Sequence, residues 1–323
     1  MRPLPRALAA NLEAWRLHYG WLVIVVAFLS TGLAIGSSQY AFGIFVEPLE
    51  RDFGWTRIEI NAALSFGAVS GAIAPLVGRL MDRVGARPVM VVSMSLIALS
   101  YLLRPYMTEL WHWYGLSILL FVGYPGATIL PAGRLVGIWF PRTRGRMMGF
   151  TTMGNNFGGL TLTPLAGAIT TAAGWQWAFR AFGFAGALVA LATLLAVREH
   201  PRVTPQAGGQ AREGAGGSRA STPAAQAALA GTSVREALRG RLFYLLTLGI
   251  VVASFTYPAV LTQVIPHLQK EGASVGRASL MLSLMAAFGM VGKLLFGYLA
   301  ERITARRALM LSLVVQILGL LIL

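Results

Sequence analysis

Three cations stand inside long apolar stretches of this 323-residue chain and are the side chains best placed to do chemistry. They are Arg134, Arg180 and Lys293, and no Asp or Glu lies well inside any of these stretches. A charge surrounded by hydrocarbon is costly unless it is paired, so such a residue marks a pathway or a binding site by default. Unpaired positive charges favour a negatively charged ligand. We therefore predict that Lys293 and Arg134 bind an anionic substrate, with Lys293 as the main counter-charge.

The two arginines also have a plainer interpretation. Arg134 and Arg180 each lie about five residues from an end of their apolar stretch, so either guanidinium can reach the lipid headgroups along its own aliphatic stem. Lys293 lies nearer the middle of its stretch, where this explanation is weaker. The sequence does not fix which way these side chains face, so both interpretations stay open.

Uncharged polar residues in the same stretches supply further candidates. We expect Tyr40 and Asn156 to line the substrate cavity. Hydrogen bonding between neighbouring helices explains both residues at least as well, because amides and hydroxyls also hold membrane helices together. Asn155 and Asn156 are adjacent, and successive residues of a helix point about 100° apart, so at most one of them faces a cavity squarely.

The composition indicates which elements must position these residues. Hydrophobic residues make up 56% of the chain and charged residues 12%, with a mean hydropathy of +0.64, which is too apolar for a water-soluble globule. About 20 apolar residues in a helix cross a membrane. We therefore predict an all-α, polytopic membrane protein that lies in the lipid bilayer. Nine stretches qualify or nearly qualify: Trp21 to Val46, Glu59 to Met81, Pro88 to Leu103, Leu110 to Phe140, Arg146 to Ala172, Trp175 to Val197, Leu242 to Pro266, Arg277 to Leu299 and Ala308 to Leu323.

The net charge of +15 is distributed as in a membrane protein. If the N-terminus is cytoplasmic, the inside segments carry nineteen arginines against six acids, whereas the outside segments carry five cations against six acids. This asymmetry follows the positive-inside rule and predicts a multi-pass protein of the cell (inner) membrane with a cytoplasmic N-terminus. A nucleic-acid-binding protein would gather its cations on one soluble face, so we do not expect a nucleic-acid partner.

The sequence gives little support for bound metals, cofactors or catalysis. There is no cysteine, and the four histidines are far apart in the sequence, so a metal site is not expected. We find no phosphate-cradling loop and no pair of catalytic carboxylates. We therefore predict neither a cofactor nor an enzyme activity.

A change in composition divides the chain. Residues 198–241 form a basic stretch rich in Gly, Ala and Pro, which is typical of a flexible cytoplasmic linker. We expect a six-helix bundle in residues 1–197 and the first three helices of a second bundle in residues 242–323. On that division three helices of the second half are missing, which indicates a truncated chain. The alternative is a nine-helix protein that does not transport.

One charged loop occurs twice. The segment GRLMDRVGAR runs from Gly78 to Arg87, and GYLAERITAR runs from Gly297 to Arg306. We predict that the two loops form a conformational lock, in which glycines permit turns and close packing while an acid binds a neighbouring arginine or helix end. The simpler alternative is that these charged residues only determine how the chain is oriented in the membrane. The lock residues are Gly78, Asp82, Arg83, Gly85, Arg87, Gly297, Glu301, Arg302 and Arg306.

The first loop resembles a family signature. It matches GxLxDRxGxR, the signature of the major facilitator superfamily, at every specified position. The segments HYGWLVI (18–24), FVEPLERDFGWTR (45–57) and WFPRTRGRMMG (139–149) resemble the monocarboxylate transporters and the oxalate/formate antiporters. This resemblance implies two six-helix halves that rock around a central site.

The resemblance also bears on the binding residues. Lys293 matches the position at which monocarboxylate transporters carry a carboxylate-binding arginine, but Gly289 stands where they carry an aspartate. A lysine found in the first helix of some members is missing, with Tyr40 near its place. These departures keep a cation and place the family's proton-linked cycle in doubt.

Together these observations predict a secondary transporter. The expected substrate is a small organic anion, a mono- or dicarboxylate, moved by alternating access. Its energy would come from a coupling proton or from exchange with a counter-anion. Two alternatives stay open: a neutral-solute or drug exporter of the same superfamily, and a non-transporting truncated remnant.

Overall fold

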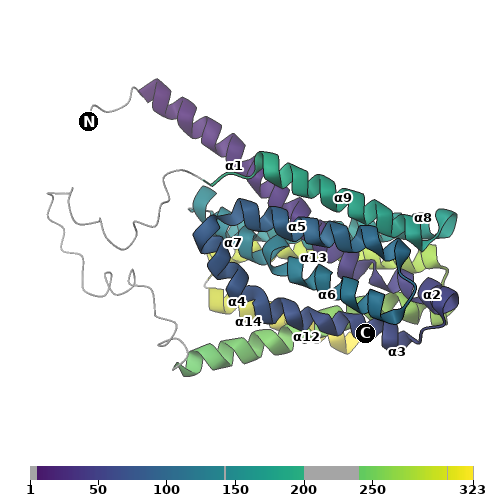
Figure 1. Cartoon of the computed structure of the whole chain (residues 1–323). Helices are drawn as coiled ribbons and strands as arrows, with labels where there is room; N and C mark the ends of the chain where they lie inside the picture. The colour runs from purple at the N-terminus through teal and green to yellow at the C-terminus, as the bar shows by residue number, and fades with distance from the viewer. Residues whose placement is uncertain (1–5, 142, 200–239, 304, 323) are drawn as a thin grey trace. The chain divides into compact units, whose positions relative to one another are not determined.

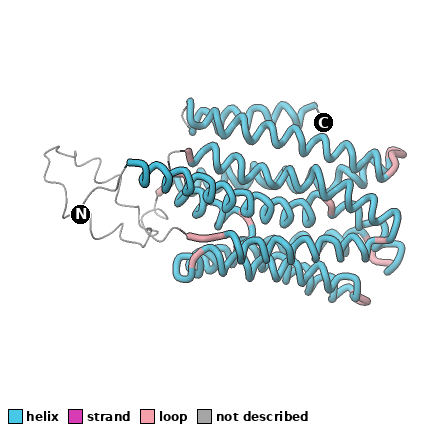
Figure 2. Tube along the Cα trace, turned by 90° about the horizontal axis from the view of Figure 1, so that it is seen from above, coloured by secondary structure: helices cyan, strands magenta, loops and turns pink. Residues whose placement is uncertain are grey.

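The computed structural model describes residues 6–141, 143–199, 240–303 and 305–322. Within these ranges the chain is all-α, as predicted, and its helices are joined by short loops (Figures 1 and 2). The elements before the middle of the chain are α1 (Arg6–Ile35), the π-helix η1 (Gly36–Tyr40), α2 (Phe42–Phe53), α3 (Arg57–Ala62), the 3-10 helix η2 (Ala63–Phe66), α4 (Gly67–Val84), α5 (Ala86–Leu103) and the 3-10 helix η3 (Arg104–Tyr106). The later elements are α6 (Leu110–Ala127), α7 (Ile129–Trp139), α8 (Arg144–Ala173), α9 (Trp175–Ala196), α12 (Arg241–Lys270), α13 (Val275–Arg302) and α14 (Ala305–Ile322).

Helices occupy all nine predicted stretches, although three stretches are interrupted. The second passes from α3 through η2 into α4. The first stretch continues from α1 through η1 into α2, and the fourth breaks at Thr128 into α6 and α7. Six segments of the described chain are long and apolar enough to cross a membrane: Tyr19–Tyr40, Arg57–Val84, Ala86–Tyr106, Leu110–Trp139, Trp175–Ala196 and Val275–Leu299.

The chain divides into two compact units. One contains residues 1–200 and 261–323, and the other contains residues 201–260. Most of the predicted linker, residues 200–239, lies outside the described part of the chain. The predicted domain boundaries at residues 197 and 241 therefore stay predictions. All contacts discussed below lie within the first unit.

Local sequence signals explain several helix ends. Thr56 and Glu59 form a reciprocal capping box at the start of α3, which satisfies backbone N–H groups that a helix start leaves without partners. Gly54 ends α2 in the left-handed conformation with a φ of 70°. Ser274 caps α13 by accepting a hydrogen bond from the backbone N–H of Arg277.

Glycines bring α1 and η1 into backbone contact with α8. A Cβ at Gly32 would lie 2.7 Å from the carbonyl oxygen of Gly154, and one at Gly36 would lie 2.6 Å from the carbonyl carbon of Gly158. Glycines four residues apart share a helix face, which suits such close contact between helices. Gly67 and Gly71 have the same spacing, yet a Cβ at Gly71 would meet no atom of the described residues within 4 Å.

The most extensive helix contact in the described chain joins α8 and α13. Two faces of α13 differ sharply: Leu282 and Ala286 are buried, whereas Phe288 and Leu295 are exposed. On a helix, residues three or four apart share a face. Lys293 continues the buried face, because it lies seven residues after Ala286 and four after Gly289. The fold thus directs this lysine toward α8.

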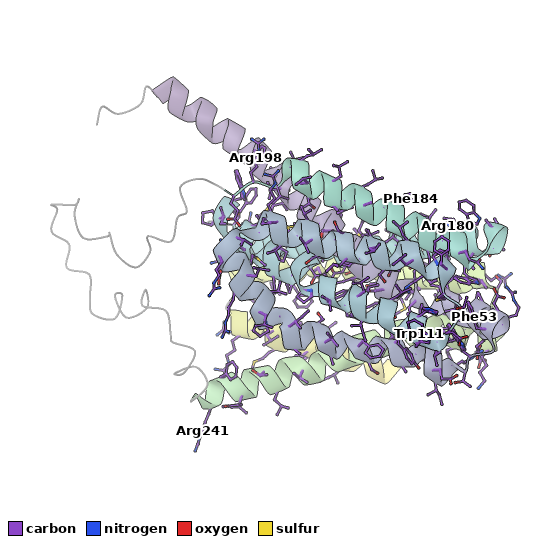
Figure 3. The ribbon with its side chains drawn as sticks, viewed as in Figure 1. Phe53, Trp111, Arg180, Phe184, Arg198 and Arg241 are labelled. Atoms are coloured by element: carbon purple, nitrogen blue, oxygen red, sulfur yellow. The ribbon has the colours of Figure 1, made fainter. Side chains whose placement is uncertain are left out.

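Helices α5 and α9 run alongside each other (Figure 1). Arg180 lies near the start of α9 and Arg198 lies just after its end. Phe53 and Trp111 lie toward the Arg180 end (Figure 3). Arg180 is half-buried, and its guanidinium lies 4.7 Å from the centre of a Trp177 ring. This position near a helix end suits an interfacial arginine.

Candidate functional site

Lys293 is tied to the backbone of α8. Its Nζ donates a hydrogen bond of 3.0 Å to the carbonyl oxygen of Thr152. The backbones are close at this level, because a Cβ at Gly149 would lie 3.1 Å from the carbonyl oxygen of Lys293. Among the described residues no carboxylate pairs with this ammonium. An ammonium has three N–H donors, so two remain for a ligand.

Asn156 lies one turn along α8 from Thr152 and contacts α13 at Gly289. A Cβ added at Gly289 would overlap the amide nitrogen of Asn156. Asn156 is 2% exposed, and its Oδ1 accepts no hydrogen bond from the residues that the structure describes. The glycine that departs from the family pattern therefore makes room for this amide. Lys293 and Asn156, both predicted to bind substrate, lie at the same interface of α8 and α13.

Tyr40 also packs on α8, in the turn after Asn156. Its ring lies directly over Gly159, where an added Cβ would overlap the ring. Tyr40 is 1% exposed. Beside it, the amide of Gln39 donates to the hydroxyl of Tyr124 at 2.9 Å. Three of the four predicted substrate residues therefore gather along about two turns of α8.

Arg134, the fourth, is held by two acids. Its Nη1 lies 2.8 Å from Oδ1 of Asp82, and its Nε lies 2.9 Å from Oε1 of Glu199. We call Asp82, Arg134 and Glu199 the Arg134 ion-pair cluster. A guanidinium already paired twice has little charge left to attract an anion, so this geometry favours a structural role for Arg134. The pairing of Arg134 with Glu199 was not predicted from the sequence, because 65 residues separate the two.

The same glutamate closes the turn of the first loop. The backbone N–H of Ala86 donates to Oε1 of Glu199 at 2.6 Å. Gly85 has a φ of 90°, and a Cβ there would lie 3.2 Å from that carboxylate. Glycine adopts this backbone conformation without the strain of a side chain. Arg87 donates from Nη2 to the carbonyl oxygen of Leu194, near the end of α9.

Two other predicted lock residues, Gly78 and Arg83, do not make the contacts expected of a lock. Gly78 lies inside α4, and a Cβ there would meet nothing within 4 Å. The prediction of a turn or a close contact at Gly78 is therefore wrong for the part of the chain that the structure describes. Arg83 is exposed and does not bind Asp82, whose partner is Arg134.

The second copy of the loop contacts α8 through an aromatic ring. The guanidinium groups of Arg146 and Arg302 lie 5.6 Å and 5.3 Å from the ring centre of Tyr298. Gly297 packs on Gly149, with 3.5 Å between an added Cβ and the Gly149 Cα. Arg306 is exposed, and the side chain of Glu301 lies outside the described part of the chain.

One buried cation was not anticipated as a site. Arg104 directly follows an apolar stretch and was counted among the outside charges, yet it is 5% exposed. No group of three or more metal-binding side chains occurs in the part of the chain that the structure describes.

Comparison with known proteins places this architecture in a family. The family model described as Major Facilitator Superfamily matches residues 21–323. The chain belongs to this superfamily. The match includes both copies of the charged loop and all the helices that carry the candidate residues, except the start of α1.

Several curated members of the superfamily are similar to this chain. An uncharacterized MFS-type transporter, YcxA of Bacillus subtilis, is 26% identical over 302 residues, which cover 90% of this chain and 67% of that protein. Monocarboxylate transporter 13 of Bos taurus is 25% identical over 91% of this chain and 65% of its own length. Monocarboxylate transporter 11 of Homo sapiens is 28% identical over 88% of this chain and 57% of its own length. The chain thus spans about three fifths to two thirds of these relatives. All three of these relatives are named as transporters.

Two solved structures of transporters share the fold. A bacterial homologue of the human lysosomal transporter Spinster aligns with a TM-score of 0.68 and 19% identity, covering 89% of this chain and 64% of that one. A D-xylose-proton symporter aligns with a TM-score of 0.58 and 18% identity, covering 88% of this chain and 70% of that one.

Proposed function

We propose that this chain is part of a secondary transporter that moves a small organic anion, a mono- or dicarboxylate, by alternating access. The observation that supports the proposal most directly is the position of Lys293. This lysine lies on the buried face of α13, one of its N–H groups donates to a backbone carbonyl, and no carboxylate of the described residues pairs with it. A cation in this setting is stabilised when a negatively charged substrate binds.

The neighbours of Lys293 suit such a substrate. Asn156 is buried at the same interface and supplies an amide that can donate or accept hydrogen bonds. The similarity to monocarboxylate transporters supports a carboxylate as the anion. Lysine presents a point charge instead of the two parallel donors of arginine, so we expect binding that tolerates several carboxylate geometries.

We further propose that the charged loops form the lock of the alternating-access cycle. The Arg134 ion-pair cluster joins α4, α7 and the residues after α9, and Tyr298 joins the second loop to α8. Breaking either set would shift the balance between two access states. The arginine distribution supports a cytoplasmic position for both loops and for the N-terminus in the inner membrane.

Uptake into proteoliposomes tests the proposal. The purified protein is reconstituted and supplied with labelled lactate or oxalate, first with a proton gradient and then with vesicles preloaded with unlabelled carboxylate. Uptake under the first condition indicates proton coupling, and uptake under the second indicates exchange. The chain has two lysines, so Lys270→Ala, at an exposed position, is a matched control for Lys293→Ala. We expect Lys293→Ala to reduce uptake at least tenfold and Lys270→Ala to leave it within twofold.

Other outcomes would contradict this proposal. Carboxylate uptake that survives Lys293→Ala would show that this lysine does not bind the substrate. Transport of a labelled neutral solute that survives Lys293→Ala, without carboxylate uptake, would favour a neutral-solute or drug exporter. Absence of any uptake by a folded, inserted protein would favour a non-transporting remnant.

A further inference from the structure

A groove opens at the junction of α5, η3 and α6. It has a volume of about 330 Å³, which falls within the range of ligand-binding pockets. A glycine leaves it room, because a Cβ at Gly115 would meet no atom of the described residues within 4 Å. Apolar and aromatic side chains supply most of the remaining wall: Leu103, Tyr106, Met107, Trp111, His112 and Leu116.

The groove lies where two membrane-spanning segments end. The apolar segments Ala86–Tyr106 and Leu110–Trp139 are joined by the short loop 107–109. Tyr106 is 71% exposed and Trp111 is 67% exposed. Exposed tyrosine and tryptophan rings at the ends of such segments are typical of the boundary between hydrocarbon and lipid headgroups. The wall of the groove is therefore open to an acyl chain, and its rim lies at the level of the headgroups.

Positive charge lies beside the groove. The guanidinium of Arg180 is 6.0 Å from the ring centre of Tyr106, and Arg180 and Trp111 lie toward the same end of the helices (Figure 3). No carboxylate of the described residues pairs with Arg180. Arg104 belongs to the same 3-10 helix as Tyr106 and adds a second, buried positive charge. The field of a buried charge is weakly screened, so both arginines favour a negative charge here.

Two side chains at the start of α6 complete the rim. The backbone N–H of Glu109 donates to Nδ1 of His112 at 3.1 Å, so the neutral imidazole keeps its proton on Nε2 and can donate it to a ligand. The carboxylate of Glu109 opposes an anion, but it accepts from the backbone N–H of His112. Arg180 and Arg104 together outweigh this single negative charge.

We propose that the groove binds one anionic phospholipid. Its acyl chain lies along Leu103, Met107 and Leu116, and its phosphate faces Arg180 and the imidazole of His112. A phosphate accepts charge-assisted hydrogen bonds from both groups, and the apolar wall selects a lipid over free phosphate. The site involves none of the residues proposed to bind the transported substrate, so it does not depend on that proposal.

Quenching of tryptophan fluorescence by brominated lipids tests the site. The purified full chain is reconstituted into phosphatidylcholine vesicles that contain either phosphatidylglycerol or phosphatidylcholine with brominated acyl chains. The contribution of Trp111 is the quenching that is lost in Trp111→Phe. We expect brominated phosphatidylglycerol to quench this contribution with about fivefold higher affinity than brominated phosphatidylcholine, because one arginine near a membrane surface favours an anionic lipid by about this factor.

Two variants with matched controls separate the headgroup from the chain. Arg180→Gln should bring the affinity ratio close to one, whereas Arg277→Gln, at an exposed position of α13, should keep it. Gly115→Leu fills the groove and should weaken the quenching of Trp111 by both lipids. Gly71→Leu should leave that quenching unchanged, because Gly71 also has open space but lies on α4. The Gly115→Leu measurement decides the matter even if Arg180→Gln does not fold.

Three outcomes would overturn the proposal. Equal affinities of the two brominated lipids in the wild type would show that Trp111 contacts bulk lipid without selecting a headgroup. A preference for phosphatidylglycerol that survives both Arg180→Gln and Gly115→Leu would place the anionic lipid elsewhere on the protein. Absence of Trp111 quenching by either lipid would show that protein covers the groove, as in contact with a second copy of this chain.

Discussion

Lys293 on α13 donates a hydrogen bond of 3.0 Å to the carbonyl oxygen of Thr152 on α8. A side-chain ammonium thus bridges two helices through a backbone acceptor, which no side-chain substitution at Thr152 can remove. The contact orients the lysine without neutralising it, since a carbonyl carries no formal charge. Substrate recognition at this interface therefore depends on whether a carboxylate reaches the ammonium.

Introducing an acid one turn before Lys293 tests this dependence. Gly289→Asp alone should destabilise the α8/α13 interface by about 1–3 kcal/mol, because its Cβ overlaps the amide of Asn156. Combining Gly289→Asp with Asn156→Ala should relieve the overlap and allow the new carboxylate to pair with Lys293 four residues later. We expect the double variant to unfold near the temperature of Asn156→Ala and yet to transport carboxylate at least tenfold more slowly.

Asn156→Ala is the control for that experiment. It removes the amide but leaves the lysine without a carboxylate partner. If the double variant and Asn156→Ala transport anions equally well, the charge of Lys293 does not govern binding.

The Arg134 ion-pair cluster gives a second prediction, on the lock. The side chain of Asp82 is 77% exposed, whereas that of Glu199 is 29% exposed. Exposed ion pairs contribute little, so Asp82→Asn should lower stability by at most about 0.5 kcal/mol. Glu199→Ala should cost about 2 kcal/mol, because it also removes the acceptor for the Ala86 N–H.

Glu199→Gln separates the two contributions of this glutamate. It keeps an oxygen for the Ala86 N–H but removes the charge that Arg134 binds. We expect it to recover about half the stability lost in Glu199→Ala while changing the transport rate as Glu199→Ala does. Arg83→Gln, at an exposed position of the same loop, should change neither. The measurements are thermal unfolding and uptake, and a rate unchanged in Glu199→Gln would exclude the ion pair from the lock.

Residue types and spacing predicted some of this site and not the rest. The helices followed from long apolar stretches, and Lys293 from a cation near the middle of one stretch. Facing was harder. Gly32 with Gly36 and Gly67 with Gly71 have the same spacing, yet only the first pair meets a neighbouring backbone on both glycines. Spacing shows that two residues share a helix face, but not what lies opposite that face.

Charges at the ends of apolar stretches were the least predictable feature. Arg104 follows its stretch directly, as interfacial arginines do, but aromatic residues from three other positions enclose it. Arg134 lies inside its stretch, about five residues from the end, and its partners are 52 and 65 residues away in the sequence. Such pairings depend on the three-dimensional arrangement of helices, which a single sequence does not specify.

The glycine contact between α1 and α8 gives a third prediction. Gly158→Ala should destabilise the protein by about 1–3 kcal/mol, because its Cβ would overlap the backbone of Gly32 and neither backbone can move independently. Gly71→Ala is the matched control in α4. It meets no neighbour, so it should be neutral or stabilising by about 0.5–1 kcal/mol. Thermal unfolding of both variants checks this prediction, and equal effects would show that the two helices can separate slightly at no cost.

The bond between Asp52 and Trp175 gives a fourth prediction, on pH. The Nε1 of Trp175 donates to Oδ2 of Asp52 at 2.8 Å, joining the end of α2 to the start of α9. This bond, assisted by Arg51, lowers the pKa of the Asp52 carboxyl below its usual value of 3.8, against a smaller opposing effect of burial. A lowered pKa in the folded state means that the carboxylate contributes stability above pH 3.8 and that this contribution is lost as the pH falls through the folded-state pKa.

Trp175→Phe should therefore lower the unfolding midpoint at pH 7, and its difference from the wild type should shrink below about pH 4. The effect should be at most about 1 kcal/mol, because a third of the Asp52 side chain is exposed to solvent. Asp52→Asn serves as the companion variant, because it keeps an acceptor for Trp175 but cannot titrate. It should show a flatter dependence on pH than the wild type. The difference in unfolding midpoint between the wild type and Trp175→Phe could instead stay constant down to pH 3. In that case the tryptophan stabilises this end of the bundle through its ring contacts and not through the carboxylate.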